Sequence, residues 1–160
     1  MTRQAPRVHR RSGATAVETA IVLGAALMFM LAIFEYGRFV MIGQVLQNSA
    51  REGARFAVVH TGDIPAPNVP NYVLNYMGGQ DVKLSNYSCT CYQADITTGN
   101  ALPGNWYDAP FGGGIAVQIT GQYKPVVLGL LVDATHSMGV TFMSSTVNVQ
   151  ATCIMLSEAN

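Results

Sequence analysis

The chain has 160 residues, enough for one domain or for a membrane anchor and a small domain. Charged residues make up 11% of it, well below the roughly 25% usual in soluble domains, whereas apolar residues reach 49%. The formal net charge is zero, so no general attraction to nucleic acid is expected. This excess of apolar surface indicates that part of the chain lies somewhere other than an ordinary core.

The first segment predicts a membrane anchor with a cytoplasmic N-terminus. Residues 1–13 contain four arginines and no acid, and residues 19–34 contain no charge. A basic segment before an apolar run keeps the N-terminus in the cytoplasm and sends the rest of the chain across the membrane. A helix over residues 14–34 spans roughly 30 Å, the thickness of a bilayer core. The run ends in Ala32-Ile33-Phe34-Glu35-Tyr36, without the small-x-small site of a cleavable secretory signal.

The helical pattern continues beyond the apolar run to about Val59. Apolar residues recur at helical spacing, polar residues fill the positions between them, and no proline occurs between Pro6 and Pro65. Small residues stack along this half, at Ser49, Gly53 and Ala57 and at Ala50 and Ala54. They suit close approach either of another helix or of a sheet. The second half is therefore amphipathic and must pack on a domain.

The remainder of the chain predicts a small domain rich in strands. Residues 61–70 form a linker with three prolines, and a short helix is expected at 71–77, ended by Gly78-Gly79. Alternating apolar residues predict strands at 82–84, 115–119, 140–142 and 147–155. One long helix with few strands predicts the α+β class, with the helix packed on a small antiparallel sheet.

Two segments of this domain are less regular. Residues 85–113 are rich in Asn, Thr, Gly and Pro, and we expect long loops there. Residues 125–132 are apolar throughout but too short to span a membrane. They form either part of the core or an exposed contact patch.

The sequence from the end of the leader through the long helix resembles a known family. The residues that carry the resemblance lie between 10 and 57: Arg10-Arg11-Ser12-Gly13-Ala14, Ala16-Val17-Glu18, Ile33-Phe34-Glu35-Tyr36-Gly37-Arg38 and Asn48 to Ala57. Over this stretch the chain is similar to the TadE-like proteins, pilin-like components of tight-adherence (Flp-type) pilus systems. One departure is Thr19, where such proteins usually have an aromatic residue.

The resemblance implies a pilin-like architecture and a structural role. A prepilin peptidase is expected to cut between Gly13 and Ala14, which makes Glu18 the fifth residue of the mature chain. The expected organisation is a leader at 1–13, a long helix at 14–60 with its transmembrane segment at 14–35, and a periplasmic or extracellular domain at 61–160. The expected partners are the membrane, the peptidase, other pilin-like subunits and pilus assembly components.

The rival hypothesis is an uncleaved single-pass anchor that carries a periplasmic scaffold or binding domain. In that case Glu18 extends to the lipid headgroups. If the leader is cut, the α-amino group of Ala14 becomes a cation one helical turn from Glu18, and the two can pair between neighbouring chains. A carboxylate in an apolar run is costly, so a functional role of Glu18 is the default hypothesis.

The remaining residues predict no enzyme, cofactor, metal or small-molecule substrate. The three histidines are scattered without ligand spacing, and no paired carboxylates or Ser/His/Asp set can be inferred. The three cysteines predict one disulfide in an oxidising compartment, between Cys153 and either Cys89 or Cys91. A bond between Cys89 and Cys91 is not expected, because it closes a very small, strained ring.

Overall fold

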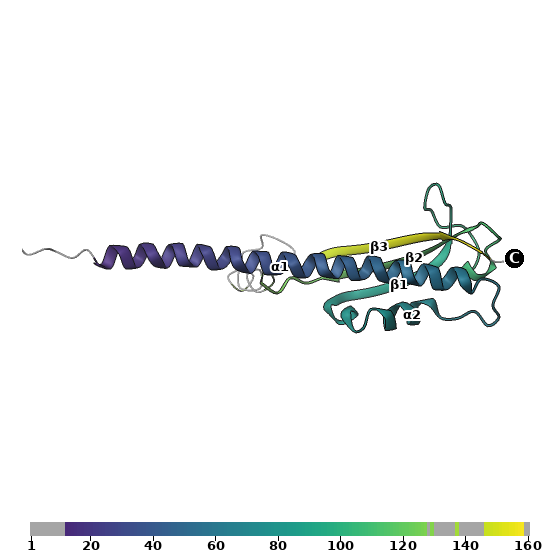
Figure 1. Ribbon diagram of the computed structural model, residues 1–160, viewed down its shortest axis with the longest axis horizontal. Coiled ribbons are helices and arrows are strands. Elements are labelled where there is room, and N and C mark those ends of the chain that lie inside the picture. Colours follow the sequence, from purple (N-terminus) through teal and green to yellow (C-terminus); the bar gives the residue numbers. More distant parts are fainter. Residues whose placement is uncertain (1–11, 128, 130–136, 138–145, 159–160) are drawn as a thin grey trace, which may run out of the picture. The chain divides into compact units, whose positions relative to one another are not determined.

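The computed structural model describes residues 12–127, 129, 137 and 146–158. Its main elements are the helices α1 (Ser12–Val59) and α2 (Val69–Tyr76) and the strands β1 (Leu84–Ala94), β2 (Gly114–Tyr123) and β3 (Val147–Leu156) (Figure 1). Short 3-10 helices lie at Gln80–Lys83 and Trp106–Asp108. The predicted α+β class is confirmed: a long apolar N-terminal helix and a small antiparallel sheet on which that helix packs.

Helix α1 contributes to two compact units, which divide between Phe34 and Glu35. In the first unit every side chain from Gly13 to Phe34 is exposed. In the second unit, buried side chains recur at helical spacing along α1, at Ile42, Leu46, Ser49, Ala50, Gly53, Ala54, Ala57 and Val58. The second half of α1 therefore has the buried stripe expected of an amphipathic helix.

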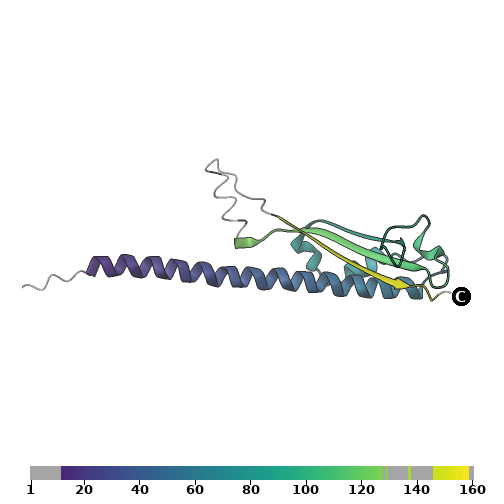
Figure 2. The ribbon, with the colours of Figure 1, turned by 90° about the horizontal axis from the view of Figure 1, so that it is seen from above.

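The sheet has the order β1-β2-β3, and both pairings are antiparallel. Figure 2 shows it lying along the second half of α1. The central strand supplies the middle of the core, because Ile115, Val117 and Ile119 alternate along it and are fully buried. The strands predicted at 115–119 and 147–155 are confirmed as parts of β2 and β3.

Small residues allow α1 to approach the rest of the domain closely. A Cβ atom at Gly53 would overlap Cγ2 of Val73 in α2 and lie 3.3 Å from Cγ1 of Val117 in β2. Ala54 and Ala57 are also fully buried. Of the two roles considered for these residues, the structure shows contact with the sheet and with α2.

Helix α2 follows the local signals of its sequence. The side-chain oxygen of Asn68 accepts a hydrogen bond from the Asn71 N–H at 3.0 Å, and Pro70 occupies the first turn. Val69 and Val73 form the buried side of the helix. The predicted short helix is thus present, beginning slightly earlier than expected.

The expectation of loops from residue 85 onward is wrong for β1. This strand extends from Leu84 to Ala94, and Tyr87, Cys89 and Cys91 alternate on its core-facing side. Polar composition was misleading because the opposite side faces solvent, where Ser and Thr are well tolerated in a strand. The predicted strand at 82–84 is a 3-10 helix up to Lys83. The strand predicted at 140–142 and half of the apolar segment 125–132 lie outside the described residues.

Candidate functional site

The predicted cleavage site lies in the first turn of α1. Gly13 and Ala14 are exposed, and a Cβ atom added at Gly13 would meet nothing within 4 Å. Glycine is a poor helix former, so the first turn of α1 unwinds easily at Gly13. The backbone can then take the extended conformation that a protease needs. The sequence places Glu18 one turn after Ala14 on the same helix.

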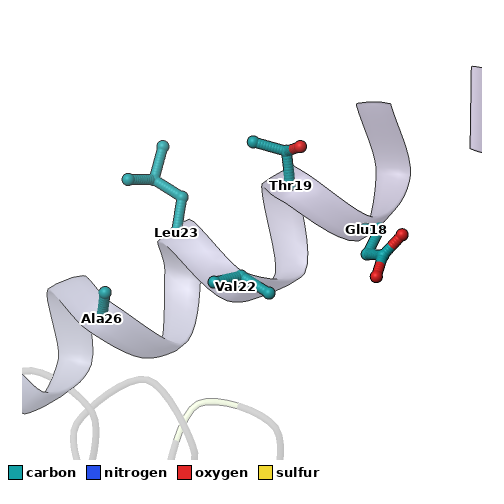
Figure 3. Close-up of a pocket in the computed structure, with 5 residues that line it drawn as sticks. All are labelled: Glu18, Thr19, Val22, Leu23 and Ala26. Atoms are coloured by element: carbon teal, nitrogen blue, oxygen red, sulfur yellow. The ribbon is translucent and has the colours of Figure 1, made fainter. Parts of the chain in front are cut away.

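Glu18 lies beside a shallow apolar groove on the exposed helix surface. Thr19, Val22, Leu23 and Ala26 line this groove together with the glutamate. Figure 3 shows Thr19 and Leu23 on one side of the helix and the Glu18 carboxylate directed away from them. The hydroxyl of Thr19 donates a hydrogen bond to the carbonyl oxygen of Thr15 at 2.8 Å, so its polarity is satisfied within the helix.

Among the described residues, the apolar side chains between Glu18 and Phe34 are all exposed. Phe29 is 75% exposed, Ile33 72% and Ile21 69%. A continuous run of exposed, large apolar side chains is unusual in a soluble monomer. Within the described residues, α1 is the one helix long and apolar enough to cross a membrane. This apolar N-terminal helix is consistent with a single-pass membrane protein.

A second carboxylate on α1, Glu35, makes hydrogen bonds that were not predicted from the sequence. Its Oε1 accepts a 2.6 Å hydrogen bond from the hydroxyl of Tyr123, at the end of β2. Its Oε2 accepts from the backbone N–H groups of Val126 and Val127 at 3.1 and 3.0 Å. One side chain at the start of the second unit therefore holds the end of the central strand and the turn after it.

Tyr123 shows how this contact combines burial with polarity. The ring is buried and lies 5.7 Å, centroid to centroid, from Phe39. Burial, followed by the hydrogen bond to Glu35, raises the pKa of Tyr123 to about 12. In the sequence, Glu35 stood out as an acid at the end of an apolar run and as part of the family motif at 33–38. Nothing local in the sequence shows that Tyr123, 88 residues later, is its partner.

The three cysteines are free thiols that face the core side of the sheet. Cys91 and Cys153 both lie opposite Val117, one on each side of β2. Two strand spacings separate their Cα atoms by about 9 to 10 Å, whereas a disulfide rarely spans more than about 7 Å. Cys89 is likewise separated from β3 by β2. The predicted bond from Cys153 to Cys89 or Cys91 is not formed here, and forming it requires the sheet to rearrange.

The thiols are also poorly suited to chemistry. Burial raises the pKa of Cys91 to about 12 and raises the pKa values of Cys89 and Cys153 as well. A thiol, rather than the reactive thiolate, is therefore the stable form at neutral pH. Among residues 12–127, 129, 137 and 146–158, no three His, Cys, Asp or Glu side chains are placed to hold a metal ion.

Comparison with protein families gives a match over the helix. A family model named TadE-like protein matches residues 13–55. Comparison with curated proteins and with solved structures found no match. The TadE-like family is a structural, pilus-associated one, which indicates a component of a tight-adherence pilus system. The matched segment contains Gly13, Glu18, Glu35 and most of the small residues that contact the sheet, and over this segment the chain is similar to the TadE-like family.

Proposed function

We propose that this chain is a minor pseudopilin, a structural component in the assembly of a tight-adherence (Flp/type IVb-like) pilus. A prepilin peptidase removes residues 1–13 at the cytoplasmic face of the inner membrane. The mature helix then begins at Ala14, and the C-terminal domain lies in the periplasm or outside the cell. The protein acts by contact with other pilin-like subunits, not by catalysis.

The observation that carries this proposal is where the family match begins. It starts at Gly13, the last residue of the basic leader, and extends through the apolar run into the domain-contacting half of α1. Removing the leader takes away four arginines that hold the helix to the cytoplasmic surface. A helix without them can be moved out of the bilayer into an assembly.

The first test is the mature N-terminus of the full chain. Mass spectrometry of membrane-extracted protein, from cells with an active prepilin peptidase, should find a chain that begins at Ala14. Gly13→Val should block the cut, and because nothing lies within 4 Å of a Cβ at this position, steric clash inside the protein cannot explain the effect. Gly24→Val, at an equally open position, should be processed normally.

An N-terminus at Met1 or Thr2 in the unaltered protein contradicts the proposal and supports the uncleaved anchor. Equal blockage by Gly13→Val and Gly24→Val also counts against it, because the effect is then a general one on the helix.

Glu18 provides the second test, since processing and assembly require different things of it. The cut creates a positive α-amino group at Ala14, and an axial offset between adjacent helices brings this cation to the Glu18 of a neighbour. Such a pair sets the register between helices and adds little net stability, because desolvation offsets most of the Coulomb attraction.

Glu18→Gln should therefore leave insertion and cleavage largely intact but reduce crosslinking to pilin-like partners and the number of surface pili. Glu18→Asp should be intermediate, because its shorter side chain reaches the amine less well. Processed protein, partner crosslinks and pili are measured for all three chains. Normal pili and normal crosslinks in Glu18→Gln contradict the pairing with the amine and leave Glu18 as a charge that only contacts the lipid headgroups.

A further inference from the structure

The two edges of the sheet are not equally protected. On β1, the pairing register shifts between Ser85 and Ser88, and Asn86 adopts a left-handed backbone with φ of 53°. At the other end of β1, Ala101 forms a bridge with Ala94, and the Leu102 N–H donates to the carbonyl of Gln93 at 2.8 Å. A bulge and a covering segment are both devices that keep an edge from pairing with another strand.

Strand β3 has neither device within the described residues. Its ten residues pair with β2 in continuous register, from Val147 opposite Tyr123 to Leu156 opposite Gly114. The strand contains no charge and no proline. Among the described strands, β2 is the only partner of β3, so no other described strand pairs with its outer row of backbone groups. A long, regular, uncharged edge of this kind is a template for an incoming strand.

A groove runs along this edge and contains a cation. Four consecutive β3 residues, Gln150 to Cys153, line it, so side chains from both faces of the sheet contribute and the strand edge itself forms one wall. The opposite wall is formed by Gln47 and Arg51, one turn apart on α1. The groove has a volume of about 280 Å³. No salt bridge of Arg51 is formed within the part of the chain that the structure describes.

We propose that this groove, the β3–Arg51 groove, binds an extended strand of another protein subunit that carries a carboxylate opposite Arg51. The strand adds to the sheet beside β3 through main-chain hydrogen bonds, and the acidic side chain pairs with the guanidinium. The proposal does not depend on leader processing or on the pilus role, because it rests on the domain alone.

Charge argues against a second copy of β3 as the occupant. Two copies paired edge to edge share a two-fold axis near the middle of the strand, around Ala151 and Thr152. Arg51 lines the groove at this same stretch, so self-pairing brings two cations to one junction. An acidic strand from a different surface turns that repulsion into attraction.

One rung of the sheet offers a matched pair of variants. Thr90 on β1 and Thr152 on β3 both lie opposite Gln118, and both are exposed. A lysine on an edge strand hinders strand addition. Thr152→Lys therefore blocks the proposed edge, whereas Thr90→Lys makes the same chemical change on the opposite edge, away from the groove.

The test uses the full chain in lipid nanodiscs and two ten-residue peptides of alternating threonine and valine. One peptide has a central glutamate and the other a central lysine, and fluorescence anisotropy measures their binding. The glutamate peptide should bind at least about tenfold more tightly than the lysine peptide, and Arg51→Glu should reverse this preference. Thr152→Lys should weaken binding of the glutamate peptide about tenfold or more, and Thr90→Lys should leave it unchanged.

Four results overturn the proposal. Three of them are no binding of the glutamate peptide, equal effects of Thr90→Lys and Thr152→Lys, and an unchanged peptide preference in Arg51→Glu. The fourth is slow hydrogen exchange at every amide of β3 in the absence of peptide. The last result means that the edge is occupied before any partner arrives. Correct folding of each variant is checked by its circular dichroism spectrum and unfolding temperature.

Discussion

The two halves of α1 belong to one helix but meet different surroundings. Up to Phe34 every described side chain is exposed and nearly all are apolar. From Ile42 onward, buried positions recur at helical spacing and are occupied largely by small residues, whereas Gln44, Gln47, Arg51 and Arg55 are exposed. Apolar residues in the first half therefore lie on all sides of the helix, whereas in the second half they are confined to one side.

This difference shows that hydrophobicity has two uses in the chain. A helix that is apolar all round needs an apolar solvent, and lipid does not distinguish one face from another. A helix packed on a sheet must match its neighbours in shape, and so Gly53 and Ala54 replace larger apolar residues there. The same amino-acid substitution should therefore have different consequences in the two halves.

Leu46→Ala and Leu23→Ala give the largest expected contrast. Leu46 is 1% exposed and Leu23 is 58% exposed. Loss of the buried side chain leaves a cavity and should lower the free energy of unfolding of the domain by about 2–5 kcal/mol. Leu23→Ala should leave it unchanged. Thermal unfolding of both variants in detergent, followed by circular dichroism, measures the difference, and similar midpoints for the two would refute the division of α1 into an exposed and a packed half.

Substitution of Glu35, where the two halves of α1 meet, should lower the stability of the domain by a smaller amount. Glu35→Ala removes three hydrogen bonds, to the Tyr123 hydroxyl and to the N–H groups of Val126 and Val127. We expect a loss of about 1–3 kcal/mol of domain stability, since hydrogen bonds to charged groups are among the stronger ones but water can reach this half-exposed site.

Glu35→Gln should cost less than Glu35→Ala, because an amide keeps one acceptor oxygen. Glu18→Gln, in the fully exposed half, serves as the control and should not change domain stability. A neutral result for Glu35→Ala, measured by urea unfolding, would mean that the contact with β2 does not hold the strand end.

The cysteines give the smallest effect and test the strand order. With β2 between Cys153 and the other two thiols, folded protein should contain three free thiols, counted by alkylation before and after reduction. A single disulfide that involves Cys153 would support the sequence-based pairing and require another arrangement of the strands.

The rate of alkylation has a defined pH dependence. The pKa of Cys91 is raised from 9.0 to about 12, so the folded state favours the protonated thiol. This stabilisation is complete below pH 9 and is lost as the pH rises from 9 toward 12. At pH 8, Cys91 should react more slowly in folded protein than in urea, where its thiolate fraction is higher. Equal rates in the two conditions would show that Cys91 is not buried.

Much of this fold follows from local patterns in the sequence. Length, the absence of proline and unbroken helical spacing predict α1, because a helix forms all its hydrogen bonds within itself. Regular alternation predicts β2 and β3, and the glycine pair Gly78-Gly79 predicts where α2 ends. The family motifs between residues 10 and 57 predict the match that was found over residues 13–55.

Tertiary structure alone decided which segments meet. Nothing near Glu35 in the sequence indicates Tyr123 as its partner, and nothing near Cys153 indicates that β2 separates it from Cys91. Strand β1 was missed because its Ser and Thr residues look like a loop until one face of the sheet is known to be solvent. Helix formation depends on neighbours in the chain, whereas strand order, register and open edges depend on long-range pairing that a single sequence does not reveal.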